Sequence, residues 1–569
     1  MKKTIFIIVS LLWSVLASAE VVDYAKAEAF AKKYFASGKV TPVNARTVAA
    51  TSSAAEPEAF HIFNNENGGW VIIAGDDVAA PVLAYSPTGS LDMTGIQENT
   101  SMNAWLGTVK IRIKEAKAKN AAPSKAWTGG ARMSGYGSGK VIETALWGQG
   151  SPFNDLCPLD DGYRSVTGCV ATAMSIVLRH HQYPAHGTGT LPSYTTRTKG
   201  IKVEGYSIDD HFYDWDLMPY DQRSFTTDAQ RNAVAQLVHD CGVMVQMDYT
   251  ANSSGAFSED IIPALAEHMG YTKTARFISR SSVSNDQWLE MIAGEIDNGR
   301  PVLYSGVSND GGHQFVCDGY DGKGNVRINW GWNGSCNGYF SVSYLGDNNS
   351  GVFSNYDDAI FGLKPATSSE PGYVPDLNFI DGGISVSDDI AKGTTFKVSI
   401  ESLANLGAET FDGNLAIFLA DRNNVLKEMI SSKMSTSIPS MNYGGPSSAS
   451  CTITSSDIKP DDGIVLAYQW NGEWYVVGST TAYGGNPIAR CGVLDVPVIV
   501  IRDNIRPGEN LYFNLNPGRE AVNSVSWYYD DRVLNYGYVT ASTGIHAIKA
   551  VVRYSSGNSD TLYRQIEVK

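Results

Sequence analysis

The chain contains few cysteines for its length, seven among 569 residues. This number is far too small for a disulfide scaffold, and because it is odd, at least one thiol stays unpaired within the chain. Cys451 and Cys491 can pair if the protein is exported, but the sequence leaves that pairing open. Basic residues are also scarce, since 44 lysines and arginines stand against 59 acidic residues and give a net charge of −15. Nucleic acids and anionic membranes bind basic surfaces, so the charge argues against either as the main partner.

Long apolar runs are absent after the first nineteen residues, so the sequence predicts no membrane span. Those first residues combine Lys2 and Lys3 with an apolar run at 5–16 and an A-x-A cleavage site at 17–19. This pattern is typical of a secretory signal peptide. We therefore expect a soluble mature protein that is secreted to the extracellular space, the cell surface or the periplasm.

Metal-binding motifs are absent as well. His180, His181 and His186 lie near one another in the sequence, but neither an H-E-x-x-H nor a C-x-x-C motif is present. The glycine-rich stretch at 135–140 lacks the spacing and the preceding strand of a phosphate-binding loop. We therefore predict no metal site and no cofactor.

What the sequence does contain is enough apolar material for several packed domains. The chain is 43% hydrophobic and 11% aromatic, and its length predicts three to four domains. Changes of pattern along the chain mark the boundaries. After the signal peptide at 1–19, we predict an α+β N-terminal segment with a basic linker at 20–140, a mixed central segment at 141–366, a β-sandwich at 367–496 and an immunoglobulin-like β-sandwich at 497–569.

The N-terminal segment begins with a predicted helix that Asp23 caps, because the apolar residues after it follow the i, i+3, i+4 spacing. Three strand-like runs follow, at 60–63, 70–74 and 81–85. The stretch 110–140 is basic and rich in Gly, Ala and Ser. We predict a helix at 110–119 and an exposed tether at 128–140, which is open to proteolysis.

The central segment carries helical patterns, most clearly at 170–181 and 229–241. After Lys364 the helical pattern nearly vanishes, and short strand-like runs such as 395–400 and 415–419 alternate with turns. Strands at this spacing are typical of β-sandwiches. The 205 residues after Lys364 (569 minus 364) suffice for two such domains.

One cysteine stands at the start of a predicted helix. The run T-G-C-V-A-T-A-M at 167–174 places Cys169 after a glycine and directly before the helix predicted at 170–181. Free N–H groups and the positive end of the helix dipole favour the thiolate, which is the nucleophilic form. On this local sequence alone, a buried structural cysteine fits about equally well.

A histidine in a suitable position favours the nucleophilic interpretation of Cys169 over the structural one. His313 follows two glycines, which leave space for a substrate backbone, and precedes an apolar strand. It lies 144 residues after Cys169 (313 minus 169), whereas papain-type peptidases place the histidine ~130–150 residues after the nucleophile. The spacing predicts that His313 is the catalytic partner of Cys169.

Two further motifs supply supporting groups. In N-W-G-W at 329–332, Asn329 can orient the imidazole through its side-chain carbonyl, while the indoles of Trp330 and Trp332 shield that bond from water. Burial in the core would explain the two tryptophans, but not their place directly after the histidine strand. Upstream, the amide of Gln149 and the backbone N–H of Cys169 can hold a developing oxyanion.

In this order, these motifs resemble the streptopain family of bacterial papain-like cysteine peptidases, which includes interpain-like enzymes. The resemblance runs from about 146 to 363. Its motifs are W-x-Q-x-x-P-[YF]-N at 147–154, T-G-C-V-A-T-A at 167–173, H-x-Y-P at 181–184, M-D-Y at 247–249 with the Ser/Gly-rich loop at 253–255, G-G-H-x-F-V at 311–316 and N-W-G-W at 329–332.

The resemblance implies roles for individual residues. Cys169 is then the nucleophile, His313 its acid/base partner and Gln149 the oxyanion donor. In this family tryptophan largely takes the place of the papain asparagine, so Trp330 is the expected neighbour of His313, with Asn329 beside it.

The resemblance also implies which residues line the substrate cleft, namely Gly312, Gly255, Ala256 and Trp332. Two features depart from the family pattern. Gln314 stands where its members usually have a small residue, and Cys157 and Cys336 lie in motif loops where cysteine is not required.

The fold class implied is α+β, with a papain-like two-lobed catalytic domain between an α+β propeptide and all-β immunoglobulin-like sandwich domains. The stretch G-W-V-I-I-A-G-D-D at 69–77 is similar to the family's inhibitory propeptide, and the basic linker then becomes the activation region. We therefore expect a secreted cysteine endopeptidase made as a zymogen, with protein or peptide substrates and its own propeptide as an intramolecular inhibitor.

Two alternatives stay open. The β-rich tail would also suit a cell-surface adhesion or scaffold protein that carries an inactive papain-like domain. A transglutaminase-like acyl transferase shares the cysteine and histidine chemistry, but would incorporate amines instead of cleaving peptides.

Overall fold

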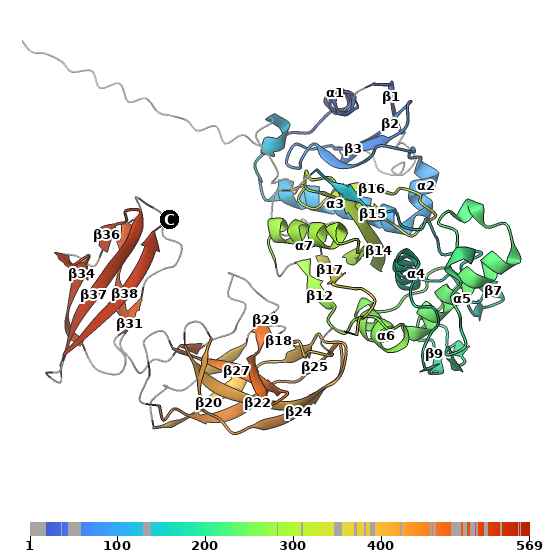
Figure 1. Ribbon diagram of the computed structural model, residues 1–569. Helices are drawn as coiled ribbons and strands as arrows, with labels where there is room; N and C mark the ends of the chain where they lie inside the picture. The colour runs from blue at the N-terminus through green and yellow to red at the C-terminus, as the bar shows by residue number, and fades with distance from the viewer. Residues whose placement is uncertain are drawn as a thin grey trace, which may run out of the picture. The chain divides into compact units, whose positions relative to one another are not determined.

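The computed structural model describes most of the chain, and its ordered elements fall into two compact units that divide between Val374 and Pro375 (Figure 1). The described residues are 19–35, 37–43, 58–128, 138–280, 283–308, 311–345, 355–368, 372–379, 383–386, 393–421, 424–455, 458, 462–479, 491–492, 498–500, 507, 510–516, 522–534, 538–555, 557 and 559–568. The predicted signal peptide and most of the predicted tether lie outside these residues, as does the predicted boundary at 496/497. No helix within the described ranges is long and apolar enough to cross a membrane.

An antiparallel sheet of eleven described strands runs through the first unit. Its order is β1-β2-β3-β4-β16-β15-β14-β13-β17-β12, and β5 also pairs with β14. The strands are β1 (Val40–Pro42), β2 (Phe60–Asn65), β3 (Trp70–Ala74), β4 (Val82–Ser86), β5 (Lys140–Val141), β12 (Arg276–Ser279), β13 (Val302–Ser308), β14 (Gly311–Tyr320), β15 (Asn325–Asn329), β16 (Gly338–Ser341) and β17 (Asn355–Phe361). The three strand runs predicted in the N-terminal segment are thereby confirmed as β2, β3 and β4.

The N-terminal and central segments share this sheet through the pair β4–β16. Tyr85 lies opposite Tyr339, and Ala84 lies opposite Phe340. The rings of Tyr85 and Tyr339 stack with centroids 4.9 Å apart. The N-terminal segment is therefore joined to the central segment by backbone pairing as well as by side-chain contacts.

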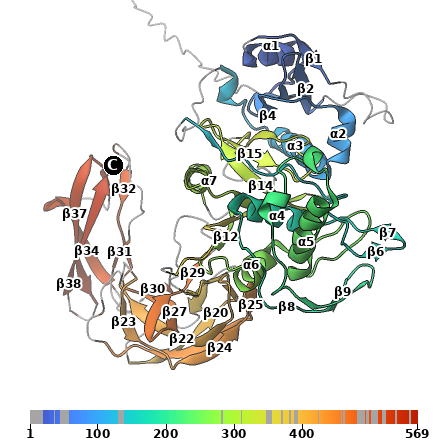
Figure 2. The same cartoon turned by 45° about the vertical axis from the view of Figure 1, so that its right-hand side comes forward.

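Helices flank the sheet, and α7 and α4 lie on opposite sides of β14 in both views (Figures 1 and 2). The helices are α1 (Tyr24–Tyr34), α2 (Met93–Glu98), α3 (Thr100–Ala118), α4 (Cys169–His181), α5 (Asp228–Met244), α6 (Ile261–His268) and α7 (Asn285–Asp297), with short 3-10 turns η1 (Lys125–Thr128), η2 (Trp215–Leu217), η3 (Gln222–Ser224) and η4 (Ser258–Asp260). Helix α1 has the predicted cap, because the carboxylate of Asp23 accepts from the N–H of Lys26 at 2.8 Å. The helices predicted around 170–181 and 229–241 are α4 and α5.

Helix α3 begins at Thr100, ten residues before the start of the helix predicted at 110–119. The predicted helix was therefore too short. The side chain of Asn99 caps the helix by accepting from the N–H of Met102 at 2.9 Å. The added turns bury Met102, Trp105 and Val109. The basic residues after position 110 mask this apolar first half of the helix in the sequence.

A large apolar core lies between the N-terminal segment, helix α7 and one face of the sheet. Phe340 of β16 stands at its centre, with ring centroids 6.2 Å from Trp70, 4.9 Å from Trp105 and 5.0 Å from Trp330. Trp70 and Trp105 belong to the N-terminal segment, and all four side chains are buried. Burial of one such side chain contributes about 1.5–3 kcal/mol, so this shared core holds the N-terminal segment firmly in place.

Three short two-stranded sheets lie outside the large sheet in the first unit. They pair β6 (Leu159–Asp160) with β7 (Tyr163–Arg164), β8 (Thr190–Leu191) with β11 (Tyr206–Ser207) and β9 (Tyr194–Thr195) with β10 (Lys202–Val203).

The second unit is all-β where it is described, which confirms the expected class. It contains two large apolar cores and a smaller third cluster around Phe418 and Val465. The first core is built on β18 (Leu377–Phe379), β19 (Ile384–Val386), β20 (Thr395–Ile400), β21 (Leu403–Asn405), β22 (Phe411–Ala420), β23 (Leu426–Met429), β24 (Met434–Ile438), β25 (Asn442–Gly444), β26 (Ser447–Thr452), β27 (Gly463–Trp470), β28 (Glu473–Val476), β29 (Gly478–Ser479) and β30 (Cys491–Gly492). The second core is built on β31 (Val498–Val500), β32 (Asn510–Tyr512), β33 (Asn514–Asn516), β34 (Val522–Tyr529), β35 (Arg532–Leu534), β36 (Tyr538–Thr540), β37 (Gly544–Tyr554) and β38 (Ser559–Val568). Cys451 is a buried free cysteine, so the pairing with Cys491 that the sequence allowed is not made. The side chain of Cys491 lies outside the described residues.

Candidate active site

Cys169 is the first residue of α4, as the sequence predicts, and Gly168 precedes it with φ of 83°. A Cβ at Gly168 would lie 2.5 Å from Sδ of Met247 and 3.0 Å from the backbone oxygen of Ser254. Glycine is therefore required here twice, for the left-handed backbone conformation and for the close approach of the 247–254 segment. This approach places the loop that contains Gly255 beside the start of α4.

We expect Gly168→Ala to lower the free energy of unfolding by about 2 kcal/mol or more, because the new methyl group has no room and the backbone is strained. The substitution should also slow the reaction of Cys169 with a thiol reagent. Urea unfolding and labelling kinetics measure the two effects. Gly150→Ala is the matched control, since a Cβ there meets nothing within 4 Å. Equal behaviour of the two variants would contradict the prediction.

The thiol of Cys169 is half-buried, and burial raises its pKa. Nearby backbone N–H groups, including those of Gln314 and Val170, favour the thiolate and oppose this rise in pKa without cancelling it. The sequence argument named only the helix N-terminus, which favours the thiolate. In this state of the chain the loss of water around the sulfur outweighs that effect, so the thiol form is favoured.

His313 lies on β14, opposite Gly306 of β13. Its Nδ1 is 3.4 Å from Oγ of Ser101, a buried residue in the first turn of α3. Within the described residues, the thiol of Cys169 makes no hydrogen bond to this imidazole. The backbone of β14 is nevertheless near the sulfur, because the N–H of the next residue, Gln314, acts on the thiol and lowers its pKa. The residue after His313 therefore lies near the thiol, while the imidazole of His313 itself contacts Ser101 of the N-terminal segment.

Gln149 is held beside the start of α4 by its backbone. Its carbonyl oxygen accepts from the N–H of Thr167, two residues before Cys169, at 3.1 Å. On the other side, the carbonyl of Trp147 accepts from the N–H of Asn333 at 2.9 Å. The predicted oxyanion donor therefore lies on a segment fixed between α4 and the loop that follows β15.

The amide of Asn329 is fully engaged at the end of β15. Its nitrogen donates to Oγ1 of Thr144 and to the carbonyl of Ala145, both at 3.0 Å, and its oxygen accepts from the N–H of Gly331 at 3.2 Å. This amide fixes the turn after β15 and does not contact the imidazole of His313.

The two tryptophans of this motif differ in their burial. Trp330 is buried in the shared core, where its indole N–H donates to the carbonyl of Cys336 at 3.2 Å and its ring lies 4.8 Å from that of Phe315. Trp332 is half-buried at the edge of the same core. Gly312, on the opposite end of the site, is exposed on β14.

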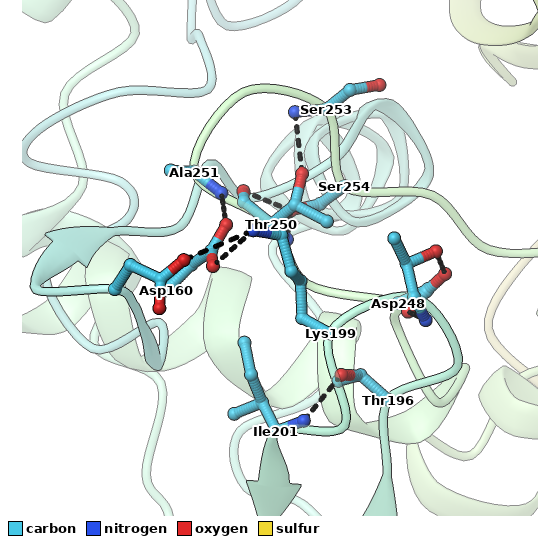
Figure 3. Close-up of polar contacts among 11 residues, drawn as sticks. Asp160, Thr196, Lys199, Ile201, Asp248, Thr250, Ala251, Ser253 and Ser254 are labelled. Atoms are coloured by element: carbon cyan, nitrogen blue, oxygen red, sulfur yellow. Dashed lines mark hydrogen bonds and ion pairs between the residues drawn. The ribbon is translucent and has the colours of Figure 1, made fainter.

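The loop that carries Gly255 and Ala256 is anchored at both ends. Asp248 and Gly255 exchange backbone hydrogen bonds of 2.8 and 3.3 Å. Nearby, a carboxylate oxygen of Asp160 accepts from the N–H of Ala251 at 2.9 Å, and the ammonium of Lys199 lies 3.0 Å from the same carboxylate (Figure 3). These contacts hold the loop against the small two-stranded sheets, close to Cys169.

The sequence argument missed two contacts of this site. Ser101 was overlooked because the first half of α3 was not recognised, although Asn99 is a capping signal for it. The side chain of Gln314 is buried and accepts from Oγ of Ser258 at 2.6 Å, while its amide nitrogen donates to the carbonyl of Tyr304 at 3.0 Å. No local signal reveals that contact, because its partners lie in other elements. Among the described residues, no group of three or more His, Cys, Asp or Glu could hold a metal ion.

Comparison with known proteins places this geometry in a family. The model of the peptidase C10 family matches residues 147–340, and that of the Spi protease inhibitor matches residues 19–113. Streptopain of Streptococcus pyogenes is 32% identical over 333 residues, which cover 54% of this chain and 80% of streptopain. The chain belongs to the peptidase C10 family. Its central segment is a cysteine endopeptidase domain, and its N-terminal segment is a propeptide of the inhibitor type.

Other C10 relatives extend the comparison. The thiol protease/hemagglutinin PrtT of Porphyromonas gingivalis is 31% identical over 378 residues, or 62% of this chain, but the match spans only 43% of PrtT. A solved fragment of prointerpain A from Prevotella intermedia is 29% identical, with a TM-score of 0.47 and coverage of 56% of this chain and 98% of the fragment.

Proposed function

We propose that this C10 peptidase is secreted as a zymogen and cleaves internal peptide bonds of protein substrates through Cys169 and His313. The thiolate of Cys169 attacks the peptide carbonyl, and the amide of Gln149 with the N–H of Cys169 stabilises the oxyanion. The imidazolium of His313 then gives its proton to the leaving amine, which leaves a thioester. Water, deprotonated by His313, hydrolyses the thioester and restores the thiol.

One observation carries this proposal. Helix α4 and strand β14 come from distant parts of the sequence, yet the backbone N–H of Gln314 lies close enough to the sulfur of Cys169 to lower its pKa. His313 directly precedes Gln314, so the same strand supports an imidazole in the neighbourhood of the thiol. Gln149, through its backbone bond to Thr167, supports an oxyanion site at the same place.

The propeptide would then inhibit the enzyme by keeping the two groups apart. Ser101 on α3 lies 3.4 Å from the imidazole of His313, and burial raises the pKa of the Cys169 thiol. Both features oppose formation of a thiolate–imidazolium pair. Release of the propeptide, cut within the basic linker, would remove Ser101 and admit water to the site. A reducing environment should help, because an oxidised thiol cannot attack.

Incubation of the purified zymogen tests this proposal. We expect a new N-terminus between 110 and 145 to appear together with a rise in peptide hydrolysis of at least about tenfold, because removal of α3 frees the imidazole. N-terminal sequencing and a fluorogenic peptide assay follow the two events. The variant Cys169→Ala should show neither event when it is incubated alone. Added active enzyme should cut its linker, but the cut variant itself should still not hydrolyse peptides. A matured chain that cleaves no peptide would overturn the proposal.

A further inference from the structure

We infer that Gln314 is a positioning residue for the nucleophile, because its side-chain amide, held between Ser258 and Tyr304, keeps its own backbone N–H close to the sulfur of Cys169. The inference rests on the proposed peptidase function and deepens it. Gln314 directly follows His313 on β14. It would act on the reaction through the thiol of Cys169, without touching the substrate.

The side chain of Gln314 is fixed at both ends of its amide. It is buried, with 2% of its surface exposed. Its Oε1 accepts from Oγ of Ser258 at 2.6 Å, and its Nε2 donates to the carbonyl of Tyr304 at 3.0 Å. Only one orientation of the amide fits, since a backbone carbonyl accepts a hydrogen bond and cannot donate one. A shorter side chain would lose both bonds, so the length and the polarity of glutamine are both used.

These two bonds join elements from different parts of the sequence. Ser258 is the first residue of η4, and Tyr304 lies on β13, which pairs with β14 along its length. The amide of Gln314 therefore ties η4 to the β13–β14 ladder. A shift of β14 relative to η4 would break the bond to Ser258, which is costly for a buried amide.

A short segment connects η4 to the entrance of α4. Oγ of Ser254 donates to the carbonyl of Val166 at 2.7 Å, and the N–H of Val166 donates to the carbonyl of Thr250 at 3.1 Å. Val166 lies three residues before Cys169, and Ser254 lies four residues before Ser258. The segment from Ser254 to Ser258 is thus bonded to the start of the cysteine helix at one end and to β14 at the other.

The contacts close into a circuit at the sulfur of Cys169. Burial raises the pKa of this thiol, and the backbone N–H of Gln314 opposes the rise most, followed by those of Val170 and Cys169. The last two N–H groups belong to α4 and move with the sulfur. The N–H of Gln314 comes from another element, so its distance from the sulfur depends on how β14 is held. The bond between Ser258 and Gln314 is the link that holds it.

Titration of the thiol in the full-length zymogen tests the inference. The ultraviolet absorbance of the thiolate is measured as the difference between each chain and the same chain with Cys169→Ala. Gln314→Met nearly keeps the volume of the side chain but removes both hydrogen bonds, so the pKa of Cys169 should rise by at least about 0.5. Ser258→Ala should raise the pKa as well, and Ser258→Thr, which keeps the hydroxyl group, should restore the wild-type value.

Gln287→Met is the matched control, since it makes the same substitution on a different element. Gln287 lies on α7, and its Oε1 accepts from the N–H of Ser284 at 3.0 Å. The control loses a hydrogen bond of glutamine, yet should leave the titration of Cys169 unchanged. Every variant keeps the titratable side chains that lie next to the circuit along the chain, namely Asp248, Glu259, Asp260 and His313.

The matured enzyme provides a second measurement. Gln314→Met should lower kcat for peptide hydrolysis at pH 7 by about threefold or more, because a smaller fraction of the thiol is ionised. KM should stay within about twofold of the wild-type value, since Gln314 makes no contact with the substrate in this role. A rise in KM at unchanged kcat would contradict the inference.

The outcomes separate two failures. An unchanged titration of Cys169 in Gln314→Met, or an equal shift in Gln287→Met, would overturn this inference and leave the peptidase function intact. A matured wild-type chain that hydrolyses no peptide would overturn the peptidase function, whereas the titration would still report on Gln314. If Gln314→Met does not fold, the two Ser258 variants decide, since a Ser258→Ala chain that titrates like wild type contradicts the positioning role.

Discussion

Cys169→Ala should lower kcat/KM for peptide hydrolysis by at least about three orders of magnitude, the scale seen when a covalent nucleophile is removed. The fold should persist, because alanine fits the first position of α4 and removes only a half-buried sulfur. A fluorogenic peptide assay on the matured enzyme measures the effect. Cys451→Ala is the matched control, since it removes a free thiol from the other unit and should not affect hydrolysis.

The same variant separates the proposed function from its alternatives. A thiol-directed peptidase inhibitor should label the matured wild-type chain once, at Cys169, and should not label Cys169→Ala. An inactive adhesion or scaffold protein would show no such stoichiometric labelling. A transglutaminase-like enzyme would incorporate an added amine into protein without cleaving it. Hydrolysis that persists in Cys169→Ala would show that another group is the nucleophile.

Asp240→Ala should produce the largest loss of stability, about 3–5 kcal/mol in the free energy of unfolding. Asp240 lies on α5 and is fully buried. Its carboxylate accepts from Tyr206 at 2.8 Å, from Tyr213 at 2.9 Å and from Nδ1 of His211 at 2.9 Å. Alanine leaves a cavity and removes the acceptor that these three groups share. Urea unfolding measures the loss.

The pH dependence of that loss follows from His211. The hydrogen bond to Asp240 raises the pKa of His211, although partial burial opposes this. The stabilisation is therefore complete below the unfolded pKa of about 6.5 and is lost as the pH rises through the raised pKa of the folded state. The difference between wild type and Asp240→Ala should be larger at pH 5.5 than at pH 8.5. Asp209→Ala, an exposed acid that accepts from Ser207, should cost less than about 1 kcal/mol at both values.

Local sequence patterns were enough to predict the elements that carry the candidate catalytic pair. Helix α4 begins at Cys169, as its apolar spacing and the preceding glycine indicated, and His313 lies on a strand that begins with two glycines. The cap at Asp23 was also visible, because a cap and its helix are neighbours in the sequence. In each case the interactions that decide the structure lie within one helix or one strand.

Features that depend on contacts between distant segments could not be predicted in this way. The direction in which the pKa of Cys169 is shifted depends on how much water the surrounding segments remove. The contacts of Gln314 with Ser258 and Tyr304 join elements that are distant in the sequence, which no local pattern contains. The contact of Ser101 with His313 requires α3 to be docked against the central segment. Each of these is set by tertiary packing.

Sharing one sheet with the propeptide has a consequence for the enzyme after maturation. Once the N-terminal segment leaves, β16 (Gly338–Ser341) loses its neighbour β4 and becomes an open edge strand, with backbone groups free to bind another chain. Phe340 loses the cover of Trp70 and Trp105 at the same moment. On the proposed maturation, proteolytic release would expose this strand edge and the apolar surface around Phe340. The mature enzyme would then either repack them or use them to bind another chain.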